Sequence, residues 1–218
     1  MISIAHRGLS ELYPENTLLA FKKAIEAGTD GIETDLRLSL DEEVILFHDD
    51  DFVRFTGSDE KPENLSLEEL KKIDVGLGES IPTLEEILQL LNKRIILVLE
   101  IKYVPSTYKK LCEIIEKKIR DKLDFVEVSC FEDRVLEYIH FLNHNIKLHK
   151  LIDRASVLCD EEFDKHYPYV SYFDIEIALR NIALKRGIMQ SHKVIFWTVD
   201  KEDLSKEKQA GLYGIMKN

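Results

Sequence analysis

Three features are missing from this 218-residue sequence: a long apolar run, an excess of basic residues and a paired cysteine pattern. No apolar run approaches the roughly 18 residues that a membrane span needs. The chain has 30 lysines and arginines against 41 aspartates and glutamates, a formal net charge of -11. Proteins that hold nucleic acid through bulk attraction need clustered basic residues. We therefore expect neither a membrane span nor a nucleic-acid partner.

Cysteine is scarce, and its three positions do not form a recognisable pattern. Cys112, Cys130 and Cys159 are widely spaced and lack a CxxC motif, which favours reduced, buried thiols over a disulfide framework or a zinc site. The N-terminus also lacks the basic region, the longer apolar segment and the cleavage site of a signal peptide. We expect a cytoplasmic location.

Short β-rich runs alternate with amphipathic, helix-like stretches along the chain. Eight runs are typical of barrel strands: MISIA, DGIETDLRLS, RIILVLEIK, FVEVSC, IKLHKLI, YVSYFDI, KVIFWTV and LYGIMKN. VILFHDD follows the second run after a polar turn and predicts a return strand. This alternation predicts one α/β domain over residues 1–218, most simply a (β/α)₈ TIM barrel with a parallel sheet. An open, doubly wound sheet is the alternative.

Helix ends are marked in the sequence as well. Ser66 with Glu69 and Thr83 with Glu86 have the spacing of capping boxes, which predicts a helix after each. The stretch ENTLLAFKKAIEAG repeats apolar residues at helical spacing and ends at Gly28, a residue favoured just past a helix end.

Charged or ionisable residues close several of the apolar runs. Seven of them stand at the ends of the first four runs, the return strand included: His6, Arg7, Glu33, Asp35, His48, Glu100 and Lys102. Residues two apart in a strand share one side of it, as the two acids of the second run do. In parallel α/β folds the strand ends open onto one face, where functional side chains gather. We therefore expect these seven side chains to meet.

The chemistry of this set favours a phosphodiester substrate. Three carboxylates repel one another unless a cation lies among them, and oxygen ligands suit Mg²⁺ or Ca²⁺ better than zinc. Arg7, Lys102 and the metal are suited to holding phosphoryl oxygens, while two histidines are suited to moving protons. Taken singly, each residue also has an ordinary interpretation as a solvated strand end, a structural histidine or an ion pair. Their joint placement favours a site.

At this point the motifs resemble the glycerophosphodiester phosphodiesterase family. AHRG, PENTLLAFKKAIEAGTDGIETDLRLS, VILFHDDDFVRFTG, IPTLEEIL, LEIK and FWTVD follow in the family's order. The resemblance implies a TIM barrel that uses a divalent cation to hydrolyse glycerophosphodiesters to glycerol 3-phosphate and an alcohol. It also implies attack by the substrate's own neighbouring hydroxyl, through a cyclic phosphate. Three sets of site residues are implied: metal ligands Glu33, Asp35 and Glu100, acid and base His6 and His48, and phosphate-holding Arg7 and Lys102.

Other positions leave alternatives open. Trp197, on the seventh barrel strand, lines the pocket against the glycerol moiety or packs in the barrel core. Asp49 orients His48 through a hydrogen bond or caps the next loop. Asn16 or Thr17 is expected to cap the first helix.

The C-terminal stretch departs from the family's pattern. GLYGIMKN stops at Asn218, where the family continues into Thr-Asp and a closing helix, so the resemblance predicts a barrel that lacks this helix. An apolar surface left uncovered there favours a homodimer. The short connection over residues 52–80 favours an open pocket and a small or variable head group.

Two other functions stay open beside the leading one. A lysophospholipase D-like hydrolase uses the same diester chemistry but needs an apolar groove for an acyl chain. A barrel that binds phosphate or metal without turnover is the other alternative, and the two histidines argue against it because binding alone needs no acid and base.

Overall fold

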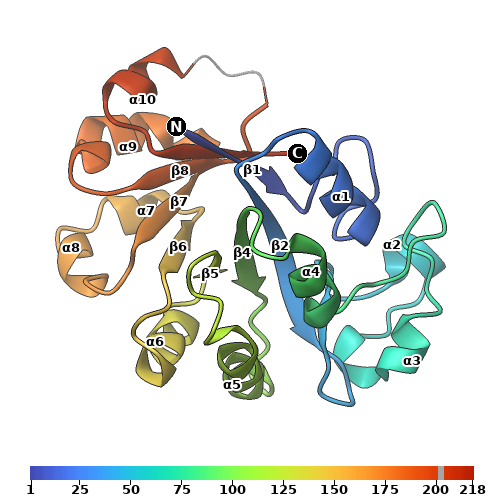
Figure 1. Cartoon of the computed structure of the whole chain (residues 1–218). Helices are drawn as coiled ribbons and strands as arrows, with labels where there is room; N and C mark the ends of the chain where they lie inside the picture. The colour runs from blue at the N-terminus through green and yellow to red at the C-terminus, as the bar shows by residue number, and fades with distance from the viewer. Residues whose placement is uncertain (201–203) are drawn as a thin grey trace.

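Eight parallel strands close into a barrel in the computed structural model, which describes residues 1–200 and 204–218. The barrel strands are β1 (Ile2–His6), β2 (Gly31–Leu38), β4 (Ile96–Ile101), β5 (Val126–Cys130), β6 (Leu148–Ile152), β7 (Tyr172–Glu176), β8 (Val194–Trp197) and β9 (Gly214–Lys217). Each pairs in parallel with its neighbours, and β9 pairs with β1 to close the ring (Figure 1). The predicted TIM barrel is confirmed, and the open-sheet alternative is wrong.

The last strand, β9, closes the barrel by pairing with the first strand, β1. Ile2 pairs with Gly214 and Ala5 with Lys217, so all four residues of β9 lie against β1. Gly214 fits this position because a Cβ there would lie 2.6 Å from the side chain of Ile2. The family's closing helix is therefore not needed to complete the ring.

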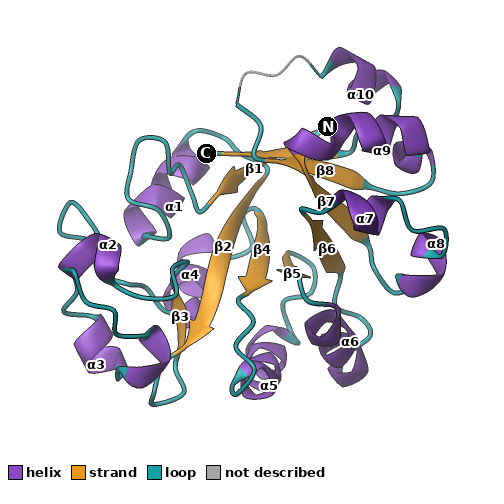
Figure 2. Ribbon diagram, turned by 180° about the vertical axis from the view of Figure 1, so that it is seen from behind, coloured by secondary structure: helices purple, strands orange, loops and turns teal. Residues whose placement is uncertain are grey.

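The helices surround the ring of strands (Figures 1 and 2). They are α1 (Leu18–Glu26), α4 (Leu84–Leu91), α5 (Tyr108–Ile119), α6 (Asp133–Leu142), α7 (Ala155–Leu158), α8 (Phe163–His166), α9 (Arg180–Arg186) and α10 (Ser205–Gln209), with 3₁₀ turns η2 (Ile177–Leu179) and η3 (Ile188–Gln190). The two predicted capping boxes are present at Ser66 and Thr83. Gly28 follows α1 with φ +78°, as predicted. Among the described residues, no helix combines the length and apolar character of a membrane span.

A small lobe lies beside the barrel after the return strand β3 (Val44–Leu46), which pairs antiparallel with β2 (Figure 2). It carries α2 (Val53–Thr56), η1 (Pro62–Asn64) and α3 (Leu67–Leu70). Phe47, Phe52 and Ile81 are buried in an apolar cluster of its own. The lobe thus holds the segment that follows His48 against the barrel.

Two of the three cysteines are buried free thiols, as predicted: Cys112 on α5 and Cys130 at the end of β5. Cys159 is exposed, so the prediction that it is buried was wrong. It forms the C-cap of α7, where the chain leaves the helix toward solvent.

The barrel interior holds a buried ionic group as well as apolar packing. His149 on β6 lies with Nδ1 3.0 Å from Asp174 Oδ2 and Nε2 2.9 Å from Glu127 Oε2. Both ring nitrogens face acceptors, so the ring satisfies both only when both are protonated. Burial alone favours the neutral ring, but the two carboxylates outweigh it and raise the pKa of His149 to about 9.

We predict that His149 stabilises the fold as an imidazolium. Because its pKa is raised from 6.5 to about 9, its contribution is complete below pH 6.5 and is lost as the pH rises through 9. The shift corresponds to about 3 kcal/mol of unfolding free energy. Histidine ¹⁵N shifts should show both nitrogens protonated at pH 7.5, and Asp174→Asn should lower the pKa. A neutral ring at pH 7.5 would contradict this account.

Candidate active site

The first site residues lie where β1 and β2 run side by side. His6 and Glu33 are register partners, and His6 Nε2 lies 3.9 Å from Glu33 Oε2. The backbone N–H of Arg7 donates to the same oxygen over 3.2 Å. Burial and the Arg7 charge lower the pKa of His6. The His6 ring and the backbone N–H of Arg7 therefore both face the Glu33 carboxylate.

The backbone after β1 explains the glycine of the AHRG motif. Arg7 has φ 56°, a left-handed conformation that few residues other than glycine adopt. Gly8 follows with φ +83°, and a Cβ there would lie 2.8 Å from Ala20 on α1. The chain therefore turns back over α1 directly after its two charged residues.

Asp35 and Glu100 are register partners on β2 and β4, and Glu33 lies two residues before Asp35. Ligand oxygens of Glu33, Asp35 and Glu100 lie within 4.8 Å of one another, and all three side chains are buried. We call these three residues the carboxylate cluster. Within the described part of the chain, Glu33 Oε1 has no hydrogen-bond partner. The cluster thus presents an unpaired oxygen in a buried place.

Two cationic side chains neutralise part of the cluster. Lys102 Nζ lies 2.8 Å from Asp35 Oδ1 and also contacts Glu100 Oε1. Arg7 Nε lies 3.1 Å from Asp35 Oδ2. Two cations face three carboxylates, which leaves one negative charge unbalanced among these residues.

The imbalance appears in the pKa values of the cluster. Burial, reinforced by the neighbouring carboxylates, raises the pKa of Glu33 well above its usual value. Burial also raises the pKa of Glu100 to about 6, because the Lys102 charge offsets it only in part. Burial opposes ionisation of Asp35 too, but Lys102 and Arg7 outweigh it and hold that pKa below its usual range. A further positive charge would therefore stabilise the ionised carboxylates of the cluster.

His48 lies just after β3, which pairs with the same edge of β2 as β1 does, opposite β4. Its Nδ1 lies 2.8 Å from Asp49 Oδ1, so the structure supports the orienting interpretation of Asp49. Ligand atoms of Glu15, His48 and Asp49 lie within 4.8 Å of one another. The His48 charge is among the causes that hold the pKa of Asp35 below its usual range.

A cavity of about 990 Å³ opens beside His6 and Arg7, at the ends of β1, β8 and β9. Glu15 lines one side of it, and Val199 and Asn218 line another. The cavity gives a substrate access to the first histidine and to the arginine.

Trp197 ends β8 at the same end of the barrel and is half-buried. Its Nε1 donates to the backbone oxygen of Asp174 over 3.0 Å, and its ring meets Phe131 edge to face. It also packs against the interior cluster around Ile195. These contacts favour the core-packing interpretation of Trp197.

The comparisons with known proteins agree with this geometry. Residues 6–218 match the model of the glycerophosphoryl diester phosphodiesterase family. The chain belongs to this family. A glycerophosphodiester phosphodiesterase from Caldanaerobacter subterraneus subsp. tengcongensis is 35% identical over 98% of this chain and 92% of its own length. The predicted family and enzyme class are confirmed.

Solved structures of phosphodiesterases share the barrel. The Thermotoga maritima glycerophosphodiester phosphodiesterase has a TM-score of 0.85 at 26% identity, covering 100% of this chain and 94% of that one. An Oleispira antarctica phosphodiesterase in complex with the product sn-glycerol-3-phosphate has a TM-score of 0.84 at 24% identity, covering 100% and 92%.

Two residues of this phosphodiesterase site were missed or misplaced by sequence reasoning. His6 Nδ1 lies 2.8 Å from Asn218 Oδ1, a contact that arises because β9 pairs with β1. Asn16 does not cap α1, since Thr17 does so by accepting from the Ala20 N–H. Instead Asn16, with φ 56°, donates to Asp35 Oδ2 over 2.8 Å. The prediction that Asn16 or Thr17 caps this helix is confirmed, with Thr17 as the cap.

We predict that Asn16→Ala destabilises this phosphodiesterase more than Thr17→Ala. Asn16 Oδ1 also accepts from Thr34 Oγ1 over 2.7 Å and from the Asp35 backbone N–H over 3.3 Å, so its loss removes the partner of two buried donors, at about 2 to 3 kcal/mol. Loss of the Thr17 cap costs about 1 kcal/mol. Urea unfolding of both variants measures the difference. Equal costs would contradict the supporting role of Asn16.

Proposed function

We propose that this phosphodiesterase hydrolyses glycerophosphodiesters to glycerol 3-phosphate and an alcohol, with one divalent cation, Mg²⁺ or Ca²⁺. The observation that carries the proposal is the carboxylate cluster, buried between two cationic side chains and one histidine. The product held by the Oleispira antarctica relative is in line with it. We propose that one barrel domain, residues 1–218, supplies all of these groups.

The cluster fits a hard cation. Its three side chains offer only oxygen ligands. One of these oxygens, Glu33 Oε1, has neither a hydrogen bond nor an ion pair among the described residues, and two cations leave the cluster short of positive charge. Glu33, Asp35 and Glu100 would hold the ion. A bound cation would supply Lewis-acid stabilisation of charge on the phosphoryl oxygens.

The two histidines would move the protons. His6 Nδ1 contacts Asn218, which directs Nε2 toward Glu33, where the phosphodiester would lie. His48 is oriented in the same manner, because its Nδ1 contacts Asp49. One ring would take a proton from the attacking hydroxyl, and the other would give a proton to the leaving alcohol oxygen.

Arg7 and Lys102 would hold the phosphoryl group beside the cluster. Both cations contact Asp35, so they lie beside the carboxylate cluster. A charge that grows on phosphoryl oxygen in the transition state would find both donors already in position.

The attacking group in this proposal is the glycerol hydroxyl next to the diester, which forms a cyclic phosphate that water then opens. A diester without that hydroxyl should therefore be inert. Full activity on such a diester would overturn this step while leaving the reaction class intact.

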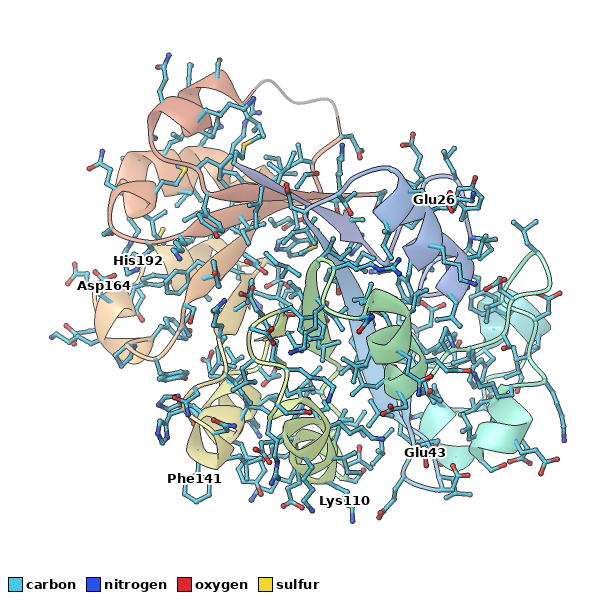
Figure 3. The ribbon with its side chains drawn as sticks, in the orientation of Figure 1. Glu26, Glu43, Lys110, Phe141, Asp164 and His192 are labelled. Carbon is cyan, nitrogen blue, oxygen red and sulfur yellow. The ribbon has the colours of Figure 1, made fainter. Side chains whose placement is uncertain are left out.

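We predict that His6→Gln and His48→Gln each lower kcat for glycerol 3-phosphate release from glycerophosphocholine by about 10² to 10⁴, the usual range for lost acid or base catalysis. His192→Gln is the control, because His192 pairs with Asp164 at the outer edge of the molecule, away from the barrel mouth (Figure 3). Equal kcat in all three variants would refute the assignment. Release of choline from lysophospholipid only would favour the lysophospholipase D alternative.

We predict that Mg²⁺ or Ca²⁺ stabilises the wild type through the cluster. At about 100 times Kd, a bound ion adds about 2.7 kcal/mol to the unfolding free energy. Glu33→Gln and Glu100→Gln should lose this gain, while Glu26→Gln, on the outer end of α1 (Figure 3), should keep it. Thermal denaturation with metal or chelator measures the effect. Stabilisation that survives in Glu33→Gln would place the ion elsewhere.

Absence of turnover in a protein that still binds the ion would favour the non-catalytic alternative.

A homodimer and a cytoplasmic location stay predictions. The large exposed apolar side chains include Leu12 in the turn after β1, Leu40 in the turn after β2 and Phe141 on α6. Light scattering at high concentration tests the dimer, and a monomer would refute it.

A further inference from the structure

We propose that Arg54 is a positioning residue, which fixes His48 and Arg7 together through the carboxylates of Asp49 and Glu15. The proposal rests on the roles proposed above for His48 and Arg7. Arg54 lies on α2 in the side lobe, outside the barrel, and its side chain is half-exposed. It therefore acts on the reaction through other residues.

One arm of this arrangement leads from Arg54 to His48. Arg54 Nε donates to Asp49 Oδ2 over 2.8 Å, and Asp49 Oδ1 lies 2.8 Å from His48 Nδ1. The Asp49 carboxylate is thus held at both oxygens. Held in this way, it accepts from the Nδ1–H of His48 and leaves Nε2 as the nitrogen that meets substrate.

The other arm leads from Arg54 to Arg7. An Arg54 terminal nitrogen donates to Glu15 Oε1 over 2.5 Å, and Glu15 Oε2 accepts from Arg7 over 3.3 Å. Arg7 Nε in turn lies 3.1 Å from Asp35 Oδ2. Arg54 therefore ties the segment after β3 to the segment after β1, although these segments are more than thirty residues apart.

An arginine suits this place because its planar fork presents two donors in fixed directions at once. Phe55 supports the fork, with the guanidinium carbon 4.5 Å from the ring centre. Without the arginine, Glu15 and Asp49 carboxylates within 4.8 Å of one another would repel. Asp49 would then turn away, and His48 would lose its fixed orientation.

The test compares Arg54→Gln and Arg54→Lys with Arg134→Gln, which removes another half-exposed arginine that stacks on an aromatic ring, Tyr103. We expect Arg54→Gln to lower kcat for glycerophosphocholine by about 10-fold to 100-fold, as losses of supporting partners do. KM should change less, and added guanidinium should restore part of kcat. Arg54→Lys should recover only part of the activity, and Arg134→Gln should match the wild type.

A double mutant separates positioning from a general structural effect. If Arg54 acts through Asp49 and Glu15, Arg54→Gln combined with Asp49→Asn should lose less activity than the product of the two single losses, because both changes remove the Asp49 arm. Additive losses would overturn the proposal, as would an unchanged kcat in Arg54→Gln.

A readout that needs no substrate distinguishes this proposal from the proposed function. Histidine ¹⁵N shifts should show the Nδ1–H tautomer of His48 in the wild type and a tautomer mixture in Arg54→Gln. If the wild type releases no glycerol 3-phosphate but the tautomer changes, the proposed function fails and the positioning by Arg54 stands. An unchanged tautomer in Arg54→Gln would overturn the positioning.

Discussion

The register of the parallel strands forces like charges together at one end of the barrel. Asp35 faces Glu100 across neighbouring strands, and Glu33 lies two residues before Asp35 on the same face. Much of the surrounding structure offsets the resulting repulsion. Arg7 and Lys102 provide charge. The left-handed turn after β1 lets the backbone N–H of Arg7 donate to Glu33, and the buried Asn16 amide donates to Asp35.

A second buried ionic group in the same barrel has its negative charges fully balanced. Glu127 and Asp174 enclose His149, and Lys147 Nζ lies 2.9 Å from Glu127. Two negative groups there meet two groups able to carry positive charge, so the charges of this group balance. The carboxylate cluster differs because only Arg7 and Lys102 balance its three carboxylates, and the pKa of its histidine, His6, is lowered where that of His149 is raised. This difference in charge balance separates a group that stabilises the barrel from one that, in the proposed function, holds an ion beside an anionic substrate.

The parts of this architecture that depend on local pattern could be predicted from the sequence. Strands end where apolar runs meet charge, and capping boxes mark helix starts, so residues such as Glu33 and Glu100 stand out within a few positions of the chain. Contacts made by ring closure or by the side lobe carry no such local signal. Asn218 reaches His6 only because the last strand returns to the first. Arg54 reaches Glu15 only because the lobe folds back beside the barrel.

Proton release on metal binding tests most directly whether the cluster is built around a cation. Titration of the wild type with Mg²⁺ or Ca²⁺ near pH 6, in two buffers of different ionisation enthalpy, counts the protons displaced. Because burial and neighbouring carboxylates raise the pKa of Glu33 and Glu100, ion binding should release protons from the wild type, and Glu33→Gln should release fewer. Binding without proton release, or equal release from Glu33→Gln, would contradict a cation held among these three carboxylates.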